Sequence, residues 1–256
     1  MARPPGFSQG ATADDSQRVA VVIVAAGGSR RMAGVDKIFA PLQGAPLISH
    51  TIDAFERCSQ VGLITLVLSE DNVERGRKLT LKHLWSKLTP ELVCSGGLRR
   101  QDSVRLGLDM VDGARYPWIA VHDGARPCVE PQLLERGLEA ARETGAAVAA
   151  VPAKDTVKVV ALDGMVESTP ARESLWMVQT PQIFSYELIL EAHSACPPDE
   201  VFTDDAALVE RLGRSVKVFM GSYSNLKVTT PEDMDVARMY LKSQIASGNQ
   251  ISVQGT

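Results

Sequence analysis

The sequence lacks paired cysteines, long apolar runs and a surplus of basic residues, and each absence removes a class of protein. Its four cysteines, at positions 58, 94, 128 and 196, form no C-x-x-C pair. Neither a disulfide framework nor a zinc site is therefore expected, and reduced thiols indicate a cytoplasmic protein. No apolar run approaches the roughly 20 residues of a membrane-spanning helix, so we expect no membrane partner. A net charge of -4 leaves no basic surplus for a nucleic-acid backbone, so we also expect no nucleic-acid partner.

Both ends of the chain lack the patterns of a folded segment. Residues 1–18 contain no apolar core of a signal peptide and predict a disordered N-terminal tail. Residues 246–256 predict a second, C-terminal tail. The apolar content of 45% and the charged content of 23% are ordinary for a globular protein. The sequence therefore predicts one large α/β domain over residues 19–245.

Two familiar phosphate-binding motifs are also missing, because the sequence has neither G-x-G-x-x-G nor G-x-x-x-x-G-K-[ST]. What is present is a β-branched run, Val19–Val24, that predicts a buried strand and leads directly into the small residues 25–28. Arg30, Arg31 and Lys37 follow. Small residues let a ligand approach backbone N–H groups, and the cations favour an anion such as a polyphosphate. The alternative is a tight strand-to-helix turn with two surface arginines.

Further along, apolar strand patterns alternate with helical patterns. Such alternation predicts a mostly parallel sheet with helices on both faces. Ligands of such sheets bind at the carboxyl ends of the strands, so the loops at Ala25, Gly96 and Asp123 are expected to converge on one site. The predicted strands are 62–68, 91–94, 118–121, 146–151 and 217–220; the predicted helices are 45–60, 75–88, 101–111, 131–143 and one that begins at Pro231 after an N-capping Thr230.

Residues 157–168 interrupt this alternation. Two short strand-like runs flank Asp163-Gly164, which is a strong hairpin signal. An isolated two-stranded hairpin is marginally stable in water. We therefore expect this hairpin to pack against a second subunit, which predicts a homodimer; the alternative is a hairpin that lies back on its own domain.

Several polar residues follow predicted strands or flank the hairpin. Asp123 could hold Mg²⁺ together with substrate phosphates, or it could simply accept hydrogen bonds in its own turn. Arg126 could bind a second anion, whereas His122 is expected to be packed rather than to act as a base. The remaining candidates are also compatible with solvated surface positions: Thr156, Lys158, Arg172 and Lys227.

Taken together, seven motifs occur in an order that resembles the 2-C-methyl-D-erythritol 4-phosphate cytidylyltransferase family. They are AAGGSRRM…DK, GG-x-x-RQDSV, HDGARP, KDT, R-x-x-LW-x-x-QTPQ-x-F, TDD and NLKVTTPED, and they cover residues 19–241. The resemblance implies a Rossmann-like nucleotidyltransferase fold whose hairpin arm, at about 153–172, is exchanged in a homodimer. It also implies a reaction of the non-mevalonate isoprenoid pathway, in which CTP and methylerythritol phosphate give CDP-methylerythritol and pyrophosphate with Mg²⁺ or another divalent cation.

The resemblance further implies a role for individual residues. Arg31 and Lys37 would stabilise charge on the triphosphate, and Arg172 and Lys227 would position the sugar phosphate. Asp123 would lie near Mg²⁺ and the substrate. The other substrate-binding residues implied are Ala25, Ala26, Gly27, Gly97, Ser103, Gly124, Arg126, Thr156 and Thr180.

The sequence departs from the family pattern at three positions: Ser29, Asp36 and Leu98. Asp36 replaces a usual proline and is expected to loosen the placement of Lys37. Two other functions stay open at this point. One is a cytidylyltransferase for another polyol phosphate, such as ribitol 5-phosphate, and the other is a non-catalytic nucleotide-binding protein.

Overall fold

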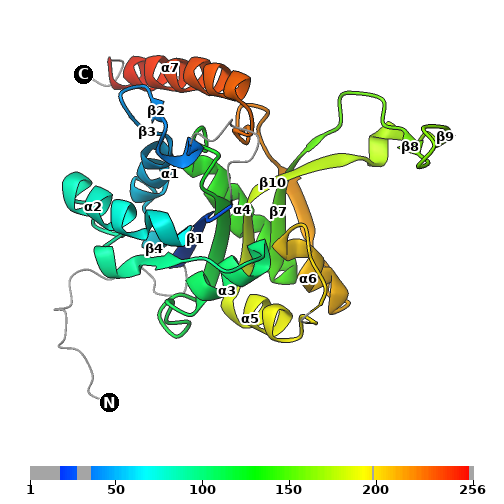
Figure 1. Ribbon diagram of the computed structural model, residues 1–256, viewed down its shortest axis with the longest axis horizontal. Helices are drawn as coiled ribbons and strands as arrows, with labels where there is room; N and C mark the ends of the chain where they lie inside the picture. Colours follow the sequence, from blue (N-terminus) through cyan, green and yellow to red (C-terminus); the bar gives the residue numbers. More distant parts are fainter. Residues whose placement is uncertain (1–17, 28–35, 198, 254–256) are drawn as a thin grey trace.

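A computed structural model describes residues 18–27, 36–197 and 199–253. Its centre is a seven-stranded sheet with the order β11-β7-β10-β6-β1-β4-β5, flanked by helices on both faces (Figure 1). The predicted α/β class is therefore confirmed. The sheet strands are β1 (Val19–Ala25), β4 (Val61–Leu68), β5 (Val93–Ser95), β6 (Trp118–Asp123), β7 (Ala146–Pro152), β10 (Trp176–Ser185) and β11 (Lys217–Met220).

Strand β1 lies near the middle of the sheet because its residues are apolar on both faces. It pairs in parallel with β4 on one side and with β6 on the other. Val21 and Ile23 pack into one core, whereas Ala20 and Val22 pack into the other. Burial on both faces explains why the sequence is continuously apolar rather than alternating.

The helices divide between these two cores. Helices α1 (Leu47–Glu56), α2 (Val73–His83) and α4 (Pro131–Thr144) pack with the first core. Helices α3 (Arg100–Leu108), α5 (Tyr186–Ser194) and α6 (Asp205–Arg211) pack with the second. Because β1, β4, β5 and β6 run in parallel, the loops that follow β1, β5 and β6 lie at one edge of the sheet.

Strand β10 is the exception to the parallel sheet. It pairs antiparallel with both β6 and β7, whereas β11 pairs in parallel with β7. Its pairing with β7 is irregular between Val178 and Gln182. This is the segment that carries the QTPQ motif, so the motif lies inside the sheet and next to the end of β6.

A β-hairpin arm leaves the body where β7 ends and returns where β10 begins (Figure 1). At its tip, β8 (Val159–Val160) pairs antiparallel with β9 (Val166–Ser168). The predicted Asp163-Gly164 turn is confirmed: Gly164 has a φ of +87°, and the Asp163 carboxylate accepts a hydrogen bond from the Met165 amide at 3.0 Å. The arm projects from its own domain instead of lying back on it.

The last helix, α7 (Pro231–Val253), extends beyond the domain boundary predicted at residue 245. The helix begins at Pro231, as predicted. The Asp233 carboxylate, in its first turn, accepts a hydrogen bond from the amide of the preceding Thr230 at 2.9 Å. Met234 and Ala237 pack on a small cluster that also contains Leu42, which belongs to the short pair β2 (Pro41–Leu42) and β3 (Ala45–Pro46). Among the described residues, no helix combines the length and apolar content needed to cross a membrane.

Candidate active site

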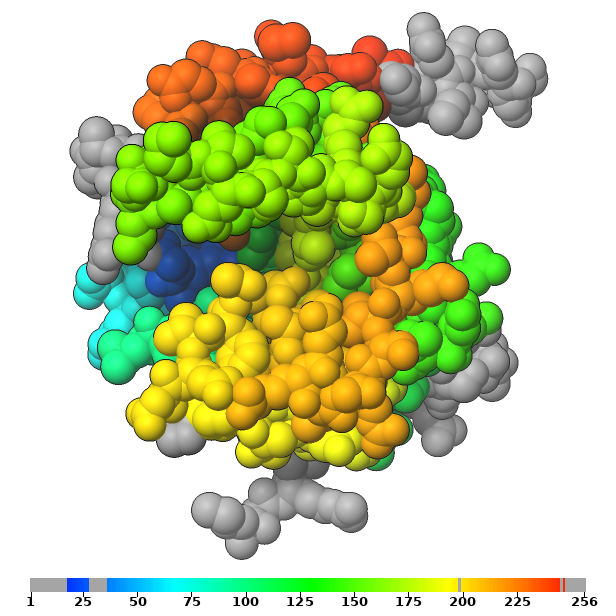
Figure 2. Space-filling view, turned by 90° about the vertical axis from the view of Figure 1, so that its right-hand side faces the viewer, coloured from blue at the N-terminus to red at the C-terminus, as the bar shows by residue number. Residues whose placement is uncertain are grey.

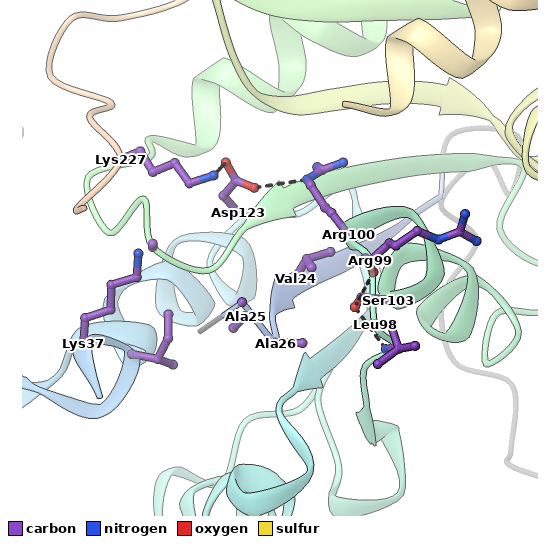
Figure 3. Close-up of a pocket in the computed structure, with 14 residues that line it drawn as sticks. Val24, Ala25, Ala26, Lys37, Leu98, Arg99, Arg100, Ser103, Asp123 and Lys227 are labelled. Atoms are coloured by element: carbon purple, nitrogen blue, oxygen red, sulfur yellow. Dashed lines mark hydrogen bonds and ion pairs between the residues drawn. The ribbon is translucent and has the colours of Figure 1, made fainter. Parts of the chain in front are cut away.

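The loops at the strand ends meet in one pocket, as the strand-end argument predicts. Small residues after β1 form one wall, the turn between β5 and α3 forms another, and charged side chains close the remaining sides (Figure 3). Figure 2 shows a hollow in the body beneath the arm, with dark blue atoms of the β1 end at its floor. The pocket is lined by Val24, Ala25, Ala26, Gly27, Lys37, Ile38, Gly97, Leu98, Arg99, Arg100, Ser103, Asp123, Ala125 and Lys227.

Asp123 is the anionic centre of this pocket. Lys227 Nζ lies 3.0 Å from its Oδ2 and Arg126 Nε lies 3.4 Å from the same oxygen. Arg100 Nε lies 3.7 Å from its Oδ1 (Figure 3). Burial alone would raise the pKa of Asp123, but these cations outweigh burial and hold the pKa well below its usual range. The carboxylate is therefore ionised at neutral pH.

Lys37 reaches the pocket from a single 3₁₀ turn, Lys37–Phe39. The Asp36 carboxylate accepts hydrogen bonds from the Ile38 amide at 3.1 Å and from Asn72 Nδ2 at 2.9 Å. Lys37 Nζ donates to the Val228 carbonyl at 3.0 Å. Asp36 therefore caps the turn that carries Lys37, and the expectation that it loosens this lysine relative to proline stays a prediction.

His122 is buried and neutral, as expected for a packed histidine. Burial lowers its pKa to about 3. Its Nδ1 lies 3.1 Å from Thr180 Oγ1, which also accepts a hydrogen bond from the Asp123 amide at 3.0 Å. His122 Nε2 lies 3.4 Å from the Arg126 carbonyl, so a proton on Nε2 leaves Nδ1 to accept the Thr180 hydroxyl proton. Thr180 thus supports the backbone of Asp123 from behind the pocket.

Glycines permit the close approach of the pocket walls. The Gly97 amide donates to Ser103 Oγ at 3.1 Å, which joins the turn after β5 to α3. A Cβ on Gly124 would lie 2.8 Å from the Ala25 Cβ, so glycine at residue 124 lets the turn after β6 come this close to the end of β1 without strain. The predicted residues Ala25, Gly97, Ser103 and Gly124 are thereby brought together.

Two predicted residues lie away from this pocket and one cannot be placed. Thr156 and Arg172 are exposed in the arm, and Arg172 Nη1 donates to the Lys154 carbonyl at 3.3 Å. Neither is among the residues that line the pocket. Arg31 lies outside the described residues. Gly124, Arg126 and Thr180 do not line the pocket either, but each lies against Ala25 or Asp123, which do. One chain therefore gathers the described body residues of the predicted site in or directly behind the pocket, but not those of the arm.

The sequence reasoning missed Arg100, which lines the pocket beside Ser103. Its Nη1 donates to Asp205 Oδ2 at 2.6 Å. The arginine stands in the GG-x-x-RQDSV motif, and its position three residues before Ser103 on α3 was the available signal. Its carboxylate partner, about a hundred residues later in the TDD motif, could not be paired with it from the sequence.

The donor set fits a divalent cation that is shared with a ligand. Within the described ranges, no three His, Cys, Asp or Glu side chains gather closely enough to hold a metal by themselves. Asp123 is ionised and lines the pocket. Mg²⁺ characteristically combines one or two carboxylates with substrate phosphates, so Asp123 suits this mode of binding.

A Rossmann-like sheet whose strand ends form a pocket of small residues and cations is typical of nucleotide-binding enzymes, and the solved structures that it resembles are cytidylyltransferases, a class of nucleotidyltransferase. Comparison with known proteins gives the family. A family model described as 2-C-methyl-D-erythritol 4-phosphate cytidylyltransferase matches residues 19–243. An enzyme of that name from Dehalococcoides mccartyi (strain CBDB1) is 47% identical over 227 residues, which cover 89% of this chain and 97% of the relative. One from Geobacter metallireducens is 43% identical over 232 residues, covering 89% and 99%.

Solved structures agree with this assignment. The crystal structure of 4-diphosphocytidyl-2C-methyl-D-erythritol synthase from Anaerococcus prevotii aligns with a TM-score of 0.77 at 30% identity, covering 89% of this chain and 97% of that one. The chain belongs to the 2-C-methyl-D-erythritol 4-phosphate cytidylyltransferase family. The predicted family and the nucleotidyltransferase fold are confirmed, and the chain is an enzyme of that class.

Proposed function

We propose that this protein joins CTP and 2-C-methyl-D-erythritol 4-phosphate, giving CDP-methylerythritol and pyrophosphate. The observation that carries the proposal is the pocket itself, where a glycine-lined wall for a nucleotide meets Lys37, Lys227 and the ionised Asp123. Two anionic reactants repel one another, and fixed cations between them reduce that repulsion. Family membership supports the same pair of substrates.

The reaction is a phosphoryl-centred displacement. An oxygen of the sugar phosphate attacks the α-phosphorus of CTP; a new P–O bond forms as the bond to pyrophosphate breaks. The attacking oxygen is already anionic, so no general base is needed, which agrees with a His122 that is neutral and buried. Lys37 stabilises charge that develops on the triphosphate, and Lys227 orients the sugar phosphate. Catalysis then rests on positioning and electrostatic stabilisation.

The nucleotide base is proposed to bind where Ala26, Gly97 and Ser103 come together. A Cβ on Gly97 would lie 2.5 Å from the Asp102 Cβ, so the turn after β5 is closely packed. A small pocket of this kind favours a pyrimidine over a purine. Mg²⁺, held by Asp123 and the substrate phosphates, would supply further charge neutralisation when bound.

We also propose that two chains assemble through the arm. Its tip exposes apolar side chains that a monomer leaves in water: Leu162 is 111% exposed and Met165 is 69% exposed. At the arm's root, Ala150 of β7 pairs with Val178 of β10 on one side and with Met220 of β11 on the other. Val178 and Met220 are both about half exposed. This apolar surface continues from the sheet face into the arm, and a second copy would cover it. Thr156 and Arg172 would then serve the partner's pocket.

Turnover assays with purified protein test the proposal. Pyrophosphate release from CTP would be measured in Mg²⁺ with methylerythritol phosphate, ribitol 5-phosphate or no acceptor. We expect release with methylerythritol phosphate and little with the other two. A clear preference for ribitol 5-phosphate would reverse the assignment of the acceptor, and no release with either would favour a nucleotide-binding protein without activity.

The cytoplasmic location stays a prediction. The four cysteines carry free thiols, as is usual for proteins of a reducing compartment.

A further inference from the structure

A buried carboxylate lies behind the pocket wall and contacts an arginine that lines the pocket. The Asp205 side chain is fully buried, and its Oδ2 accepts a hydrogen bond from Arg100 Nη1 at 2.6 Å. His193 Nε2 lies 3.3 Å from its Oδ1. Burying a carboxylate is costly unless a charge partner compensates it, so Asp205 depends on Arg100.

The backbone around Asp205 is fixed to the sheet by an amide side chain. Gln182, in β10, accepts hydrogen bonds through its Oε1 from the amides of Asp205 and Ala206, both at 3.1 Å. Its Nε2 donates to Asp204 Oδ2 at 2.8 Å. The first turn of α6 is thus held at a defined place, and the carboxylate of Asp205 is a rigid anchor for the arginine.

Arg100 connects this anchor to the centre of the pocket. Its Nε lies 3.7 Å from Asp123 Oδ1, which is an ion-pair distance but too long for a hydrogen bond. Burial alone would lower the pKa of Arg100, but Asp205 and then Asp123 outweigh burial and raise it. The other oxygen of Asp123, Oδ2, faces Lys227 and Arg126 instead. Each oxygen of Asp123 therefore has its own cationic neighbours.

We propose that Asp205 is a positioning residue that acts through Arg100 to fix the orientation of the Asp123 carboxylate. The inference rests on the proposed function, because it assumes that Asp123 meets the triphosphate and its Mg²⁺. Without Asp205, Arg100 keeps only its ion pair with Asp123. The guanidinium then has no fixed place beside Oδ1, and the Asp123 carboxylate loses its defined orientation toward the ligand.

The test compares Asp205→Asn with Glu210→Gln. Both substitutions remove one carboxylate from α6. Glu210 is exposed and does not line the pocket, so its substitution leaves the Asp205–Arg100 pair and the hydrogen bonds of Gln182 in place. The measurements are kcat with CTP and methylerythritol phosphate, CTP affinity by calorimetry in Mg²⁺ and in EDTA, and the melting temperature.

We expect Asp205→Asn to lower kcat by about 10- to 100-fold, as is typical when the support of a ligand-binding group is removed. Its CTP affinity should fall in Mg²⁺ and stay within about twofold of the wild type in EDTA, because only the Mg²⁺ complex requires an oriented Asp123. Glu210→Gln should behave like the wild type. If Asp205→Asn fails to fold, Arg100→Lys replaces it, since lysine keeps the charge but lacks the guanidinium fork.

Two results would overturn the inference. One is an Asp205→Asn enzyme with the same kcat as Glu210→Gln. The other is an equal loss of CTP affinity in Mg²⁺ and in EDTA, which would mean that Asp205 only supports the fold. A wild type that binds CTP but does not turn over methylerythritol phosphate would instead contradict the proposed function, and the two binding measurements would still decide the role of Asp205.

Discussion

The pocket and the arm are built in opposite ways. Pocket residues follow the ends of β1, β5 and β6, and the charged centre, Asp123, is only 7% exposed and surrounded by cations. The arm has two short strands at its tip and exposes Val160, Leu162 and Val166. A parallel sheet assembles its site within one chain, because its strand ends lie along one edge. The arm has no core of its own and leaves these apolar side chains exposed.

The two regions nevertheless meet at the root of the arm. The Tyr223 hydroxyl donates to the Pro152 carbonyl at 2.8 Å, at the end of β7. Gln179 Nε2, in β10, donates to the Ser222 carbonyl at 2.9 Å. These contacts attach the loop that leads to Lys227 to both strands from which the arm departs. The root of the arm and the loop that leads to Lys227 are therefore held together.

The largest effect is expected inside the pocket, for Lys37→Ala. Because the lysine's charge would act mainly on the transition state, we expect kcat to fall by about 100-fold or more. The Kd for CTP should change much less. Lys82→Ala, which removes an exposed lysine from α2, is the matched control. Steady-state kinetics and calorimetry check this, and equal losses in kcat and CTP affinity would contradict a transition-state role.

A mixing experiment tests directly whether the arm completes another chain's pocket. Arg172→Ala and Lys37→Ala should each be nearly inactive. Mixed and allowed to exchange subunits, they should recover about a quarter of wild-type activity, because half of the dimers would be mixed and each would contain one intact site. The measurement is turnover before and after mixing. If no activity returns although mixed dimers are present, Arg172 does not serve the partner.

The surface of the arm gives a third, smaller effect. Val160→Asp combined with Leu162→Asp places charges on the exposed apolar tip. We expect the particle mass measured by light scattering to fall from two chains to one, because buried unpaired carboxylates oppose association. Leu84→Asp, at an equally exposed apolar position after α2, should leave the mass unchanged. A fully active monomer would argue against the exchanged arm.

The parts of the fold that could be predicted from the sequence are those with a strong local pattern. The apolar run of β1 predicts a central strand, and Asp163-Gly164 predicts the tip of the arm. Strand β10 was not predicted, because Gln, Thr and Pro interrupt its apolar pattern and Pro181 cannot donate to a sheet. The structure accommodates this segment with the irregular pairing between Val178 and Gln182.

The candidate site shows the same division. Ala25, Gly97 and Asp123 could be placed together because each follows a strand end, and that argument needs only the chain order. The pairing of Arg100 with Asp205 could not be predicted, since it depends on α3 and α6 lying on the same face of the sheet. Motifs identify both residues, but only the packing shows that one anchors the other.

The smallest effect concerns the contact between two pocket loops. Gly124→Ala would place a Cβ 2.8 Å from the Ala25 Cβ and 2.8 Å from Ile48 Cδ1, which is closer than carbon atoms pack. We expect the free energy of unfolding to fall by about 1–3 kcal/mol, as for other overpacked sites. Gly27→Ala is the control, because a Cβ there meets no atom of the described residues within 4 Å. Urea unfolding of both variants checks this. Equal stabilities would mean that the turn after β6 can move away from Ala25 without loss of stability, so that the pocket wall is not rigid at this point.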